Sequence, residues 1–226
     1  MEKYFDLLLG TPLFADIERD DLSSMLNCMG AKIINLQKST PVFLEGSAAG
    51  FVGLVLEGSI QIVHDDFYGK RSVLSIAERR DLFAEAFACA NVDTMPVSGY
   101  ATKESKVMLL SCKRMLTVCS NACRFHNQLV NNLLKVVAQR NLYLNNKITY
   151  MSQKTTKETL MSFLLAEAKR FGNSEFTIPF DRQALADFLG VERSAMSAEL
   201  SKLRKAGVLD CKGSWFRLID PEQVAI

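Results

Sequence analysis

The chain has 226 residues, a formal net charge of +2, 48% hydrophobic residues and 23% charged residues. This composition excludes extensive disorder, and the length suffices for one large domain or two smaller ones. No apolar run approaches the ~18 residues of a membrane span, and Met1–Asp6 opens with charges instead of a signal-peptide pattern. We therefore expect a cytoplasmic protein without a membrane partner.

The cysteines predict free thiols, because a chain of this size can build its core without disulfides. Only Cys119 and Cys123 are close in sequence, and no second pair or histidine-rich segment completes a tetrahedral metal set. We expect no structural zinc. The six cysteines are Cys28, Cys89, Cys112, Cys119, Cys123 and Cys211.

The first half of the chain predicts helical structure followed by strands. Met1–Met29 has a helical pattern, with Asp20 as a candidate N-cap. From about Lys32 to Leu110, short apolar runs alternate with turn residues at a spacing typical of an all-β barrel or sandwich. Asp65–Gly69 lies between two such runs and predicts a hairpin turn. The runs are Pro41–Leu44, Phe51–Leu56, Ile60–Val63 and Val73–Ile76.

The pattern after Cys112 predicts a helix of ~30 residues with one apolar stripe. Its length of ~45 Å exceeds what so small a domain usually covers, so the stripe favours packing along the same helix of a second copy. The alternative is that the stripe packs only onto its own domain. The stripe comprises Val130, Val137, Leu144 and Met151, which repeat every seven residues, with Leu133, Leu134 and Ile148 between them.

A further helix is predicted from about residue 156, because Thr155–Glu158 forms a capping box. Gly172–Asn173 ends it. We place a domain boundary near Ser152. The apolar face of this helix comprises Leu160, Phe163, Leu164 and Ala168.

Phe180–Ile219 predicts a helix, a tight turn, a second helix and a β hairpin. Asp181 can cap the first helix, and Gly190–Val191 makes the turn. The second helix runs from about Arg193 to Ala206. The first helix buries Leu185, Ala186 and Leu189, the second buries Met196, Leu200 and Leu203, and the hairpin joins Val208–Cys211 to Trp215–Ile219.

The outer face of the second helix suits the DNA major groove, because its side chains are small and its donors lie near the N-terminal end. Arg193 is the strongest candidate for contacting a base or a phosphate, and Ser194 and Ser197 are weaker candidates. The charge of this region supports DNA binding only weakly, since Ser152–Ile226 contains 11 Lys or Arg against 10 Asp or Glu. The alternative is a helical hairpin that merely packs a domain.

Catalytic chemistry is not expected. The sequence has no Ser/His/Asp set, no phosphate-cradling glycine loop and no HExxH motif, and it has two histidines, His64 and His126. The chain is therefore predicted not to be an enzyme.

Two regions resemble the Crp/Fnr regulators. Arg182–Val191, followed by Arg193–Ser197 and Leu200–Leu203, is similar to the helix-turn-helix of that family. The turn glycines and phosphate-binding cassette of its cyclic-nucleotide-binding-like β-roll are matched by Phe43–Gly46, Leu56–Ile60, Gly69 and Asp81–Glu85.

The resemblance implies an α+β fold with three parts. Residues 1–120 form an N-terminal antiparallel β-roll (jelly roll) that senses an effector, residues 121–152 a long dimerisation helix, and residues 153–226 a C-terminal winged helix-turn-helix. The implied function is a homodimeric transcription regulator that binds a pseudo-palindromic site in double-stranded DNA, with RNA polymerase as a further partner.

The resulting site residues fall into three groups. The DNA-binding residues are Arg182, Gln183, Arg193, Ser194, Ser197, Lys202, Lys205 and Lys212. The effector pocket comprises Phe83, Ala84, Glu85, Ala86, Met95, Pro96, Ser98, Arg140 and Tyr143. The dimer interface comprises Val130, Leu133, Val137, Leu144, Ile148 and Met151.

Departures from the family pattern bear on the effector. Its cyclic-nucleotide binders hold the phosphate with an arginine followed by Ser or Thr, but the matching stretch here is Thr94–Ser98, which lacks arginine. Without a cation, the phosphate would lose its water without gaining a charged partner, which is costly. Glu85 is still present at the position where the family uses a carboxylate to bind the ribose. We expect an effector other than cAMP, suited to a partly apolar pocket.

No bound cofactor is expected. The oxygen-sensing branch of the family carries an N-terminal cysteine cluster for iron and sulfur, and nothing before Cys28 supplies one. A haem ligand is not expected, because an isolated His64 or His126 is usually a surface or packing residue. Two alternatives remain: control by redox chemistry or a protein partner without a small effector, and a ligand-binding module without DNA binding.

The reading helix departs from the family as well. Members that bind its best-known sites have Glu and a second Arg where this chain has Ser194 and Ala198. With Arg193 alone able to make a bidentate contact to guanine, we expect a different target sequence.

Overall fold

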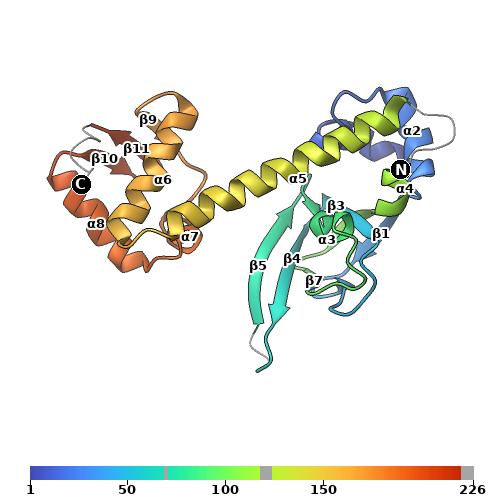
Figure 1. Cartoon of the computed structure of the whole chain (residues 1–226), viewed down its shortest axis with the longest axis horizontal. Helices are drawn as coiled ribbons and strands as arrows, with labels where there is room; N and C mark the ends of the chain where they lie inside the picture. The colour runs from blue at the N-terminus through green and yellow to red at the C-terminus, as the bar shows by residue number, and fades with distance from the viewer. Residues whose placement is uncertain (69–70, 118–123, 220–226) are drawn as a thin grey trace. The chain divides into compact units, whose positions relative to one another are not determined.

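The computed structural model describes residues 1–68, 71–117 and 124–219 (Figure 1). Their contacts divide the chain into an N-terminal unit, Met1–Gln139, and a C-terminal unit, Arg140–Ile226. The division falls inside the long helix α5, Arg124–Met151, which has 28 residues. The predicted boundary at residue 120 lies outside the described residues, and α5 ends directly before Ser152.

The N-terminal segment forms two short α-helices and two 3-10 turns instead of continuous helix. The elements are η1 (Glu2–Tyr4), α1 (Phe5–Leu9), η2 (Pro12–Phe14) and α2 (Arg19–Cys28). The prediction of Asp20 as an N-cap is wrong, because Glu18 is the cap residue and Asp20 lies in the first turn of α2. There its negative carboxylate interacts favourably with the positive end of the helix dipole.

Two four-stranded antiparallel sheets form the β-roll, as predicted. One has the order β1–β8–β3–β6 and the other β2–β7–β4–β5. The first contains β1 (Lys32–Leu36), β3 (Phe51–Glu57), β6 (Leu82–Phe83) and β8 (Ser105–Ser111), and the second contains β2 (Pro41–Phe43), β4 (Ser59–Asp65), β5 (Arg71–Glu78) and β7 (Ser98–Ala101).

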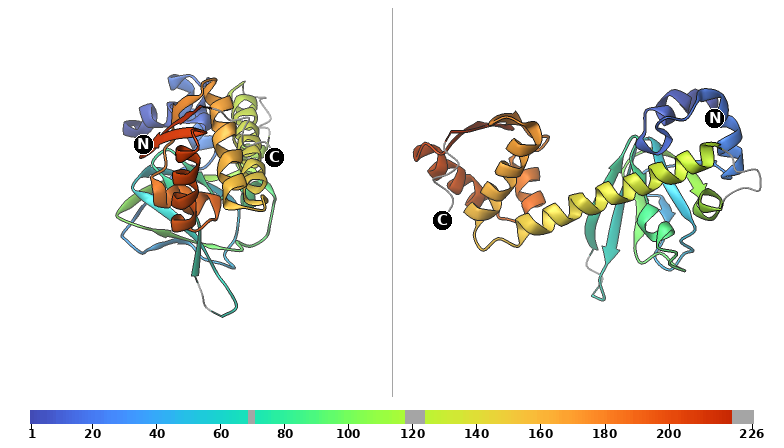
Figure 2. Two further views of the ribbon diagram at one scale, coloured as in Figure 1. Left: turned by 90° about the vertical axis from the view of Figure 1, so that its left-hand side faces the viewer. Right: turned by 45° about the horizontal axis from the view of Figure 1, so that its top comes forward.

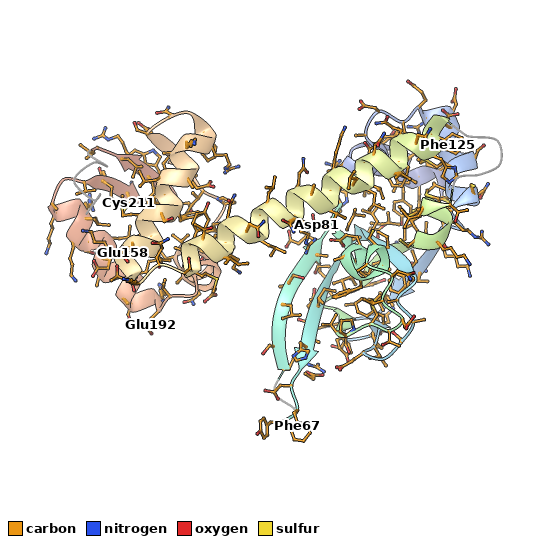
Figure 3. The ribbon with its side chains drawn as sticks, viewed as in Figure 1. Phe67, Asp81, Phe125, Glu158, Glu192 and Cys211 are labelled. Atoms are coloured by element: carbon orange, nitrogen blue, oxygen red, sulfur yellow. The ribbon has the colours of Figure 1, made fainter. Side chains whose placement is uncertain are left out.

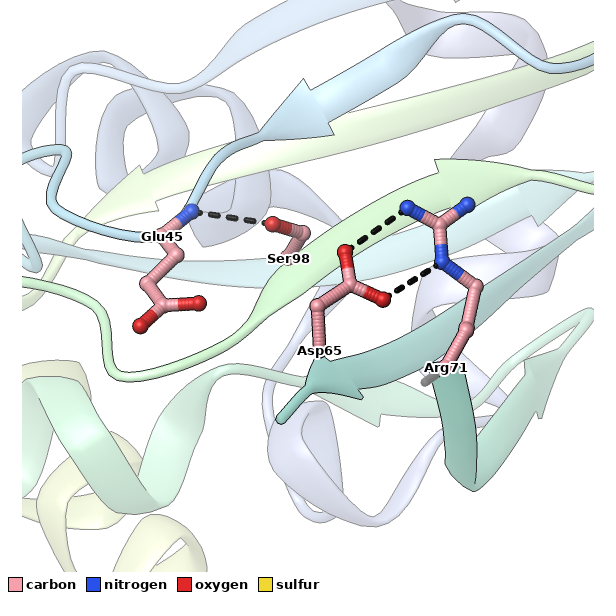
Figure 4. A network of polar contacts seen from close by, with 4 residues as sticks. All are labelled: Glu45, Asp65, Arg71 and Ser98. Carbon is pink, nitrogen blue, oxygen red and sulfur yellow. Dashed lines mark hydrogen bonds and ion pairs between the residues drawn. The ribbon is translucent and has the colours of Figure 1, made fainter. Parts of the chain in front are cut away.

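The β4–β5 hairpin projects beyond the rest of the N-terminal unit (Figure 2), with Phe67 at its end (Figure 3). The predicted turn at Asp65–Gly69 lies between these strands, although Gly69 itself is outside the described residues. Asp65 and Arg71 face each other across the hairpin, and two N–H donors of the guanidinium each reach a carboxylate oxygen at 2.8 Å (Figure 4). This pair joins the two strands at the end next to the turn, opposite the end at which Ser59 pairs with Glu78.

The interior between the two sheets is filled by aromatic and aliphatic side chains. The rings of Phe43 and Phe83 stack with centroids 6.4 Å apart, and Phe51 meets Phe43 edge-on at 5.8 Å. The close fit depends on Gly53, because a Cβ there would lie 2.1 Å from Phe83 Cζ. A short helix, α3 (Glu85–Cys89), follows β6, and α4 (Cys112–Leu116) follows β8.

The C-terminal unit begins with α6 (Thr156–Phe171) and its capping box, which confirms the prediction. Thr155 Oγ1 accepts from the Glu158 backbone N–H at 3.2 Å, and the Glu158 carboxylate accepts from the Thr155 N–H at 3.1 Å. Gly172 ends α6 in the left-handed conformation.

A three-stranded sheet completes this unit, in the order β10–β11–β9. The hairpin of β10 (Leu209–Lys212) and β11 (Trp215–Leu218) was predicted, whereas β9 (Glu175–Thr177) was not. β9 has only three residues, too short for a periodic signal. It pairs Phe176 with Phe216. Among the residues that the structure describes, no helix is long and apolar enough to cross a membrane.

Candidate nucleic-acid interface and sensor interior

The helices α7 (Arg182–Leu189) and α8 (Arg193–Lys205) are joined by the predicted tight turn. Asp181 caps α7, because its Oδ1 accepts from the Ala184 N–H at 2.8 Å. Gly190 makes the turn with φ +66°, and a Cβ there would lie 2.7 Å from Met151 Cε. A side chain at this position would therefore be strained by the backbone conformation and would displace the end of the Met151 side chain.

The inner and outer faces of α8 separate as predicted. Met196, Leu200 and Leu203 are buried in the core of the C-terminal unit. Arg193 and Ser197 are exposed on the other side. No hydrogen bond or ion pair holds the Arg193 guanidinium among the described residues. The first turn of α8 thus presents an available cation and a small hydroxyl side chain to solvent.

Carboxylates hold three of the other predicted binding residues. Gln183 Nε2 donates to Asp187 Oδ1 at 2.8 Å, and the Lys202 ammonium lies 2.6 Å from Glu199 Oε1. The Ser194 hydroxyl donates to Glu192, which lies at the start of α8 (Figure 3). These exposed contacts are weak in water, so a phosphate can displace the acidic partner at little cost.

A concave site lies where the start of α7, the outer face of α8 and the β hairpin meet. Its volume is about 230 Å³. Arg182 contributes a guanidinium whose Nη1 is buried without a hydrogen-bond partner, while its carbon atom lies 5.0 Å from the centre of the Phe216 ring. The lining residues are Arg182, Ser197, Leu200, Ser201, Arg204 and Cys211.

Ser201 and Arg204 were not among the predicted binding residues. Their spacing from Ser197, four and seven positions along one helix, places them on the same face and is the signal that could have identified them. Arg204 is paired with Asp210 at 2.9 Å. Lys205 and Lys212 are exposed, and Lys212 lines a second concavity of about 490 Å³ beside Arg204 and Trp215.

The predicted effector pocket divides between buried and exposed residues. Ala86 and Pro96 are exposed, whereas Ser98 is buried and its Oγ accepts from the Glu45 backbone N–H at 3.0 Å (Figure 4). Ala84 has a left-handed backbone, with φ 62°, at the start of α3. The buried members are Phe83, Ala84, Glu85, Met95 and Ser98.

Arg140 and Tyr143, predicted to close that pocket, belong to the C-terminal unit. The Tyr143 ring packs against Phe188 of α7, with centroids 5.8 Å apart. Burial raises the pKa of the Tyr143 phenol above its ordinary value, and the charge of Arg140 opposes this shift. The structure therefore places Tyr143 in the helix-turn-helix unit, where aromatic side chains offer it an apolar partner.

The predicted dimer stripe is partly buried within its own unit. Leu133 is 3% exposed and lies in the N-terminal core, and Val137 packs against that core. Val130 is half-buried. Leu144, Ile148 and Met151 are 49%, 64% and 50% exposed. The alternative of packing onto the chain's own domain thus applies to Leu133, while the last turns of α5 keep an apolar face in solvent.

The four described cysteines, Cys28, Cys89, Cys112 and Cys211, are free thiols, while Cys119 and Cys123 lie outside the described residues. Within the described ranges, no group of three or more His, Cys, Asp or Glu could hold a metal ion. His126 is 1% exposed and stacks on Phe125.

Two family models match the chain. The cyclic nucleotide-binding domain matches residues 33–122, and the Crp-like helix-turn-helix domain matches residues 158–225. These ranges correspond to the β-roll and to the unit built around α7 and α8. Each match agrees with the architecture described above.

Known relatives and a solved structure extend the likeness over most of the chain. A CRP-like cAMP-activated global transcriptional regulator of Mycobacterium tuberculosis is 21% identical over 225 residues, covering 97% of each chain. The transcriptional activator protein FnrA of Stutzerimonas stutzeri is 20% identical, over 82% of this chain and 75% of that protein.

The c-di-GMP-responsive global regulator CLP of Xanthomonas campestris has a similar fold, with a TM-score of 0.56, 18% identity, and coverage of 89% of this chain and 99% of that one. Domain content, fold and relatives agree. The chain belongs to the Crp/Fnr family of DNA-binding transcription regulators and combines a cyclic-nucleotide-binding-like domain with a Crp-like helix-turn-helix.

Proposed function

We propose that the protein acts as a homodimer in which each copy places α8 in the major groove of one half of a pseudo-palindromic DNA site. The exposed first turn of α8 carries this proposal. There Arg193 offers a guanidinium with no partner among the described residues, next to Ser194 and Ser197. A bidentate guanidinium contact to guanine is the commonest specific contact in the major groove.

Phosphate binding is assigned to the concave site beside α8. Arg182 has a buried N–H donor without a partner, which is costly unless a ligand oxygen accepts from it. Ser197, Ser201 and Arg204 line the same site and can donate to further phosphate oxygens. Further contacts to the DNA phosphate backbone around this site are assigned to Gln183, Lys202, Lys205 and Lys212.

Dimerisation is assigned to the apolar stripe of α5, which is partly buried at Val130 and Val137 and exposed over the last turns. Val130, Leu134, Val137, Leu144, Ile148 and Met151 follow the alternating spacing of three and four residues that is typical of a coiled-coil seam. Asn141 occupies the remaining position of this spacing. A polar residue at one seam position fixes the register of two parallel helices at some cost in stability.

The effector is proposed to be a small, partly apolar molecule other than cAMP, bound beside Phe83, Glu85 and Met95. Met95 and Val97 are 1% and 5% exposed, so the stretch that would hold a cyclic phosphate is occupied by buried apolar side chains. The relatives support no single effector, since one is named cAMP-activated and another c-di-GMP-responsive. Contact with RNA polymerase belongs to the same proposal, because FnrA is named an activator.

Selection of a preferred site from random duplex DNA, followed by mobility shifts, tests the DNA-reading assignment. Arg193→Ala is expected to weaken specific binding by about 1–3 kcal/mol. Lys169→Ala is the matched control, because it removes one positive charge from an exposed position of α6 in the same unit. Equal affinities for Arg193→Ala and the unaltered protein would refute the role of Arg193, and failure to enrich any sequence would refute specific binding.

Calorimetry tests the effector assignment. Titration with cAMP is expected to give no binding heat, while the M. tuberculosis relative, named cAMP-activated, serves as the positive control. Micromolar binding of cAMP to this protein would overturn the proposal.

A further inference from the structure

Two thiols of the N-terminal unit lie together at the ends of different helices. Cys89 is the last residue of α3, and Cys112 is the first residue of α4. The two helices pack against each other, and Cys89 contacts the buried cluster that contains Cys112. Cys112 is 2% exposed and its backbone N–H donates to the Gly50 carbonyl at 3.1 Å, whereas Cys89 is only half-buried.

The Cys89 and Cys112 side chains lie close enough to interact, so the thiol proton of Cys112 can be directed at the Cys89 sulfur. Donation from Cys112 stabilises the Cys89 thiolate and lowers the pKa of Cys89 to about 7, against the opposing effects of burial and of the Glu85 carboxylate. The same hydrogen bond, together with burial, raises the pKa of Cys112. Cys89 therefore combines solvent access with thiolate character, as reactive cysteines do, and Cys112 is a protonated partner beside it.

Closing a disulfide requires the segment around α3 to shift. A disulfide needs a sulfur–sulfur distance of about 2.05 Å. α3 has five residues and lies between two left-handed residues, Ala84 with φ 62° and Asn91 with φ 53°. α3 contacts β3 but contributes no strand to either sheet, so a shift of Cys89 requires no change in the hydrogen bonds between β3 and β8.

We propose that Cys89 and Cys112 form an oxidation site that reacts with a hydroperoxide and closes to a reversible disulfide. The Cys89 thiolate attacks the peroxide oxygen, the O–O bond breaks, and the leaving alkoxide, or hydroxide when the oxidant is hydrogen peroxide, takes a proton from solvent to become an alcohol or water. Cys89 is then a sulfenic acid. The Cys112 sulfur attacks Cys89 Sγ, the S–O bond breaks, and the departing hydroxide leaves as water with the Cys112 proton.

The electrons balance over these two steps. The two thiols lose two electrons in forming the S–S bond, and the peroxide gains two in becoming an alcohol and water. A dithiol reductant reverses the reaction by thiol–disulfide exchange. This chemistry needs only the N-terminal unit and does not depend on the proposed DNA contacts.

Cys28 and Cys211 provide the controls. Cys28 is exposed, and Cys211 is half-buried and belongs to the C-terminal unit. The full-length chain carrying Cys28→Ser and Cys211→Ser should therefore oxidise as the unaltered protein does. Cys89→Ser and Cys112→Ser should each abolish the disulfide.

The experiment treats the reduced full-length protein with equimolar hydrogen peroxide, blocks remaining thiols, and maps peptides by mass spectrometry without reduction. We expect a peptide pair linked through Cys89 and Cys112 that disappears after treatment with dithiothreitol. In Cys112→Ser, dimedone should trap a sulfenic acid at Cys89, because the resolving thiol is gone.

Circular dichroism of each variant verifies that it is folded, so that loss of the linkage reports chemistry. The proposal is overturned if the linked pair is absent from the folded, oxidised protein. It is also overturned if Cys89 oxidises no faster than Cys28, or if dimedone labels other cysteines in Cys112→Ser but not Cys89.

Discussion

The two candidate sites of this chain differ in their exposure: one is on the surface of its unit, and the other is buried in the interior of its unit. In the C-terminal unit the chemistry lies outside, on the exposed first turn of α8, and the core behind it consists of apolar side chains. In the N-terminal unit the candidate residues Phe83, Glu85 and Met95 lie inside, at 3% exposure or less. The exposed side chains of one helix form the first site, and side chains buried between two sheets form the second.

This difference determines how substitutions act. Removing a side chain from the outer face of α8 removes a possible DNA contact and leaves the core intact. DNA affinity should therefore fall while the free energy of unfolding stays the same. Removing one from the β-roll interior changes the packing that defines the site, so stability and ligand binding should change together.

The largest expected effect is the loss of an interior ring. Phe83→Ala should lower the free energy of unfolding by about 3–5 kcal/mol, because the cavity removes stacking on Phe43 and contact with Gly53. A urea titration measures it. Phe67→Ala, at a position 98% exposed, should change stability by less than about 0.5 kcal/mol. A cost for Phe83→Ala below about 1 kcal/mol would show that the interior is not tightly packed.

The second prediction separates two arginines of the exposed site. Arg182→Gln should weaken specific and nonspecific DNA binding alike and reduce the slope of log affinity against log salt by about 1, as expected for a phosphate contact. Arg193→Ala should weaken only specific binding, by about 1–3 kcal/mol. Mobility shifts at several salt concentrations measure both. If Arg182→Gln altered sequence preference, its assignment to phosphate would be wrong.

The outer face of α8 could be predicted from sequence, since helical spacing alone separates Met196, Leu200 and Leu203 from Arg193 and Ser197. The caps at Asp181 and Thr155 and the turn at Gly190 were also predictable, because each depends on neighbouring residues. The partners of the exposed residues were not. Glu192 and Glu199 are local, yet nothing in their spacing says which rotamer brings them to Ser194 and Lys202.

The β-roll interior could be predicted only in outline. Alternating apolar runs predicted the strands, but the stacking of Phe43 on Phe83 depends on how two distant strands face each other. The packing of Tyr143 on Phe188 and the pairing of Cys89 with Cys112 likewise join residues far apart in sequence. Such contacts follow from topology, which local periodicity does not contain.

A smaller effect is expected at the start of α6. Thr155→Ala breaks the capping box and should destabilise the C-terminal unit by about 1 kcal/mol, while leaving the β-roll unchanged. Urea unfolding with a probe in each unit tests this, since Trp215 reports on the C-terminal unit. Ser174→Ala, an exposed position after α6, is the control and should be neutral. Equal effects in both units would contradict the assignment of this cap to one unit.

The smallest expected effect is a shift in the pH dependence of Cys89 alkylation, with the fold unchanged. Alkylation of Cys89 by iodoacetamide should be half-maximal near pH 7, because donation from Cys112 lowers its pKa while burial and Glu85 raise it. Since the folded-state pKa is depressed, the thiolate's contribution to stability is present above the ordinary thiol pKa and is lost as pH falls through about 7.

Cys112→Ala removes the donor and should move the profile toward the ordinary thiol value of about 8.5. Peptide-level mass spectrometry in a Cys28→Ser, Cys211→Ser background isolates Cys89 from the other described thiols. An unchanged profile in Cys112→Ala would mean that the buried thiol does not activate its neighbour. In that case the inward-facing site of the N-terminal unit would differ from the outward-facing site of the C-terminal unit only in how its residues are packed.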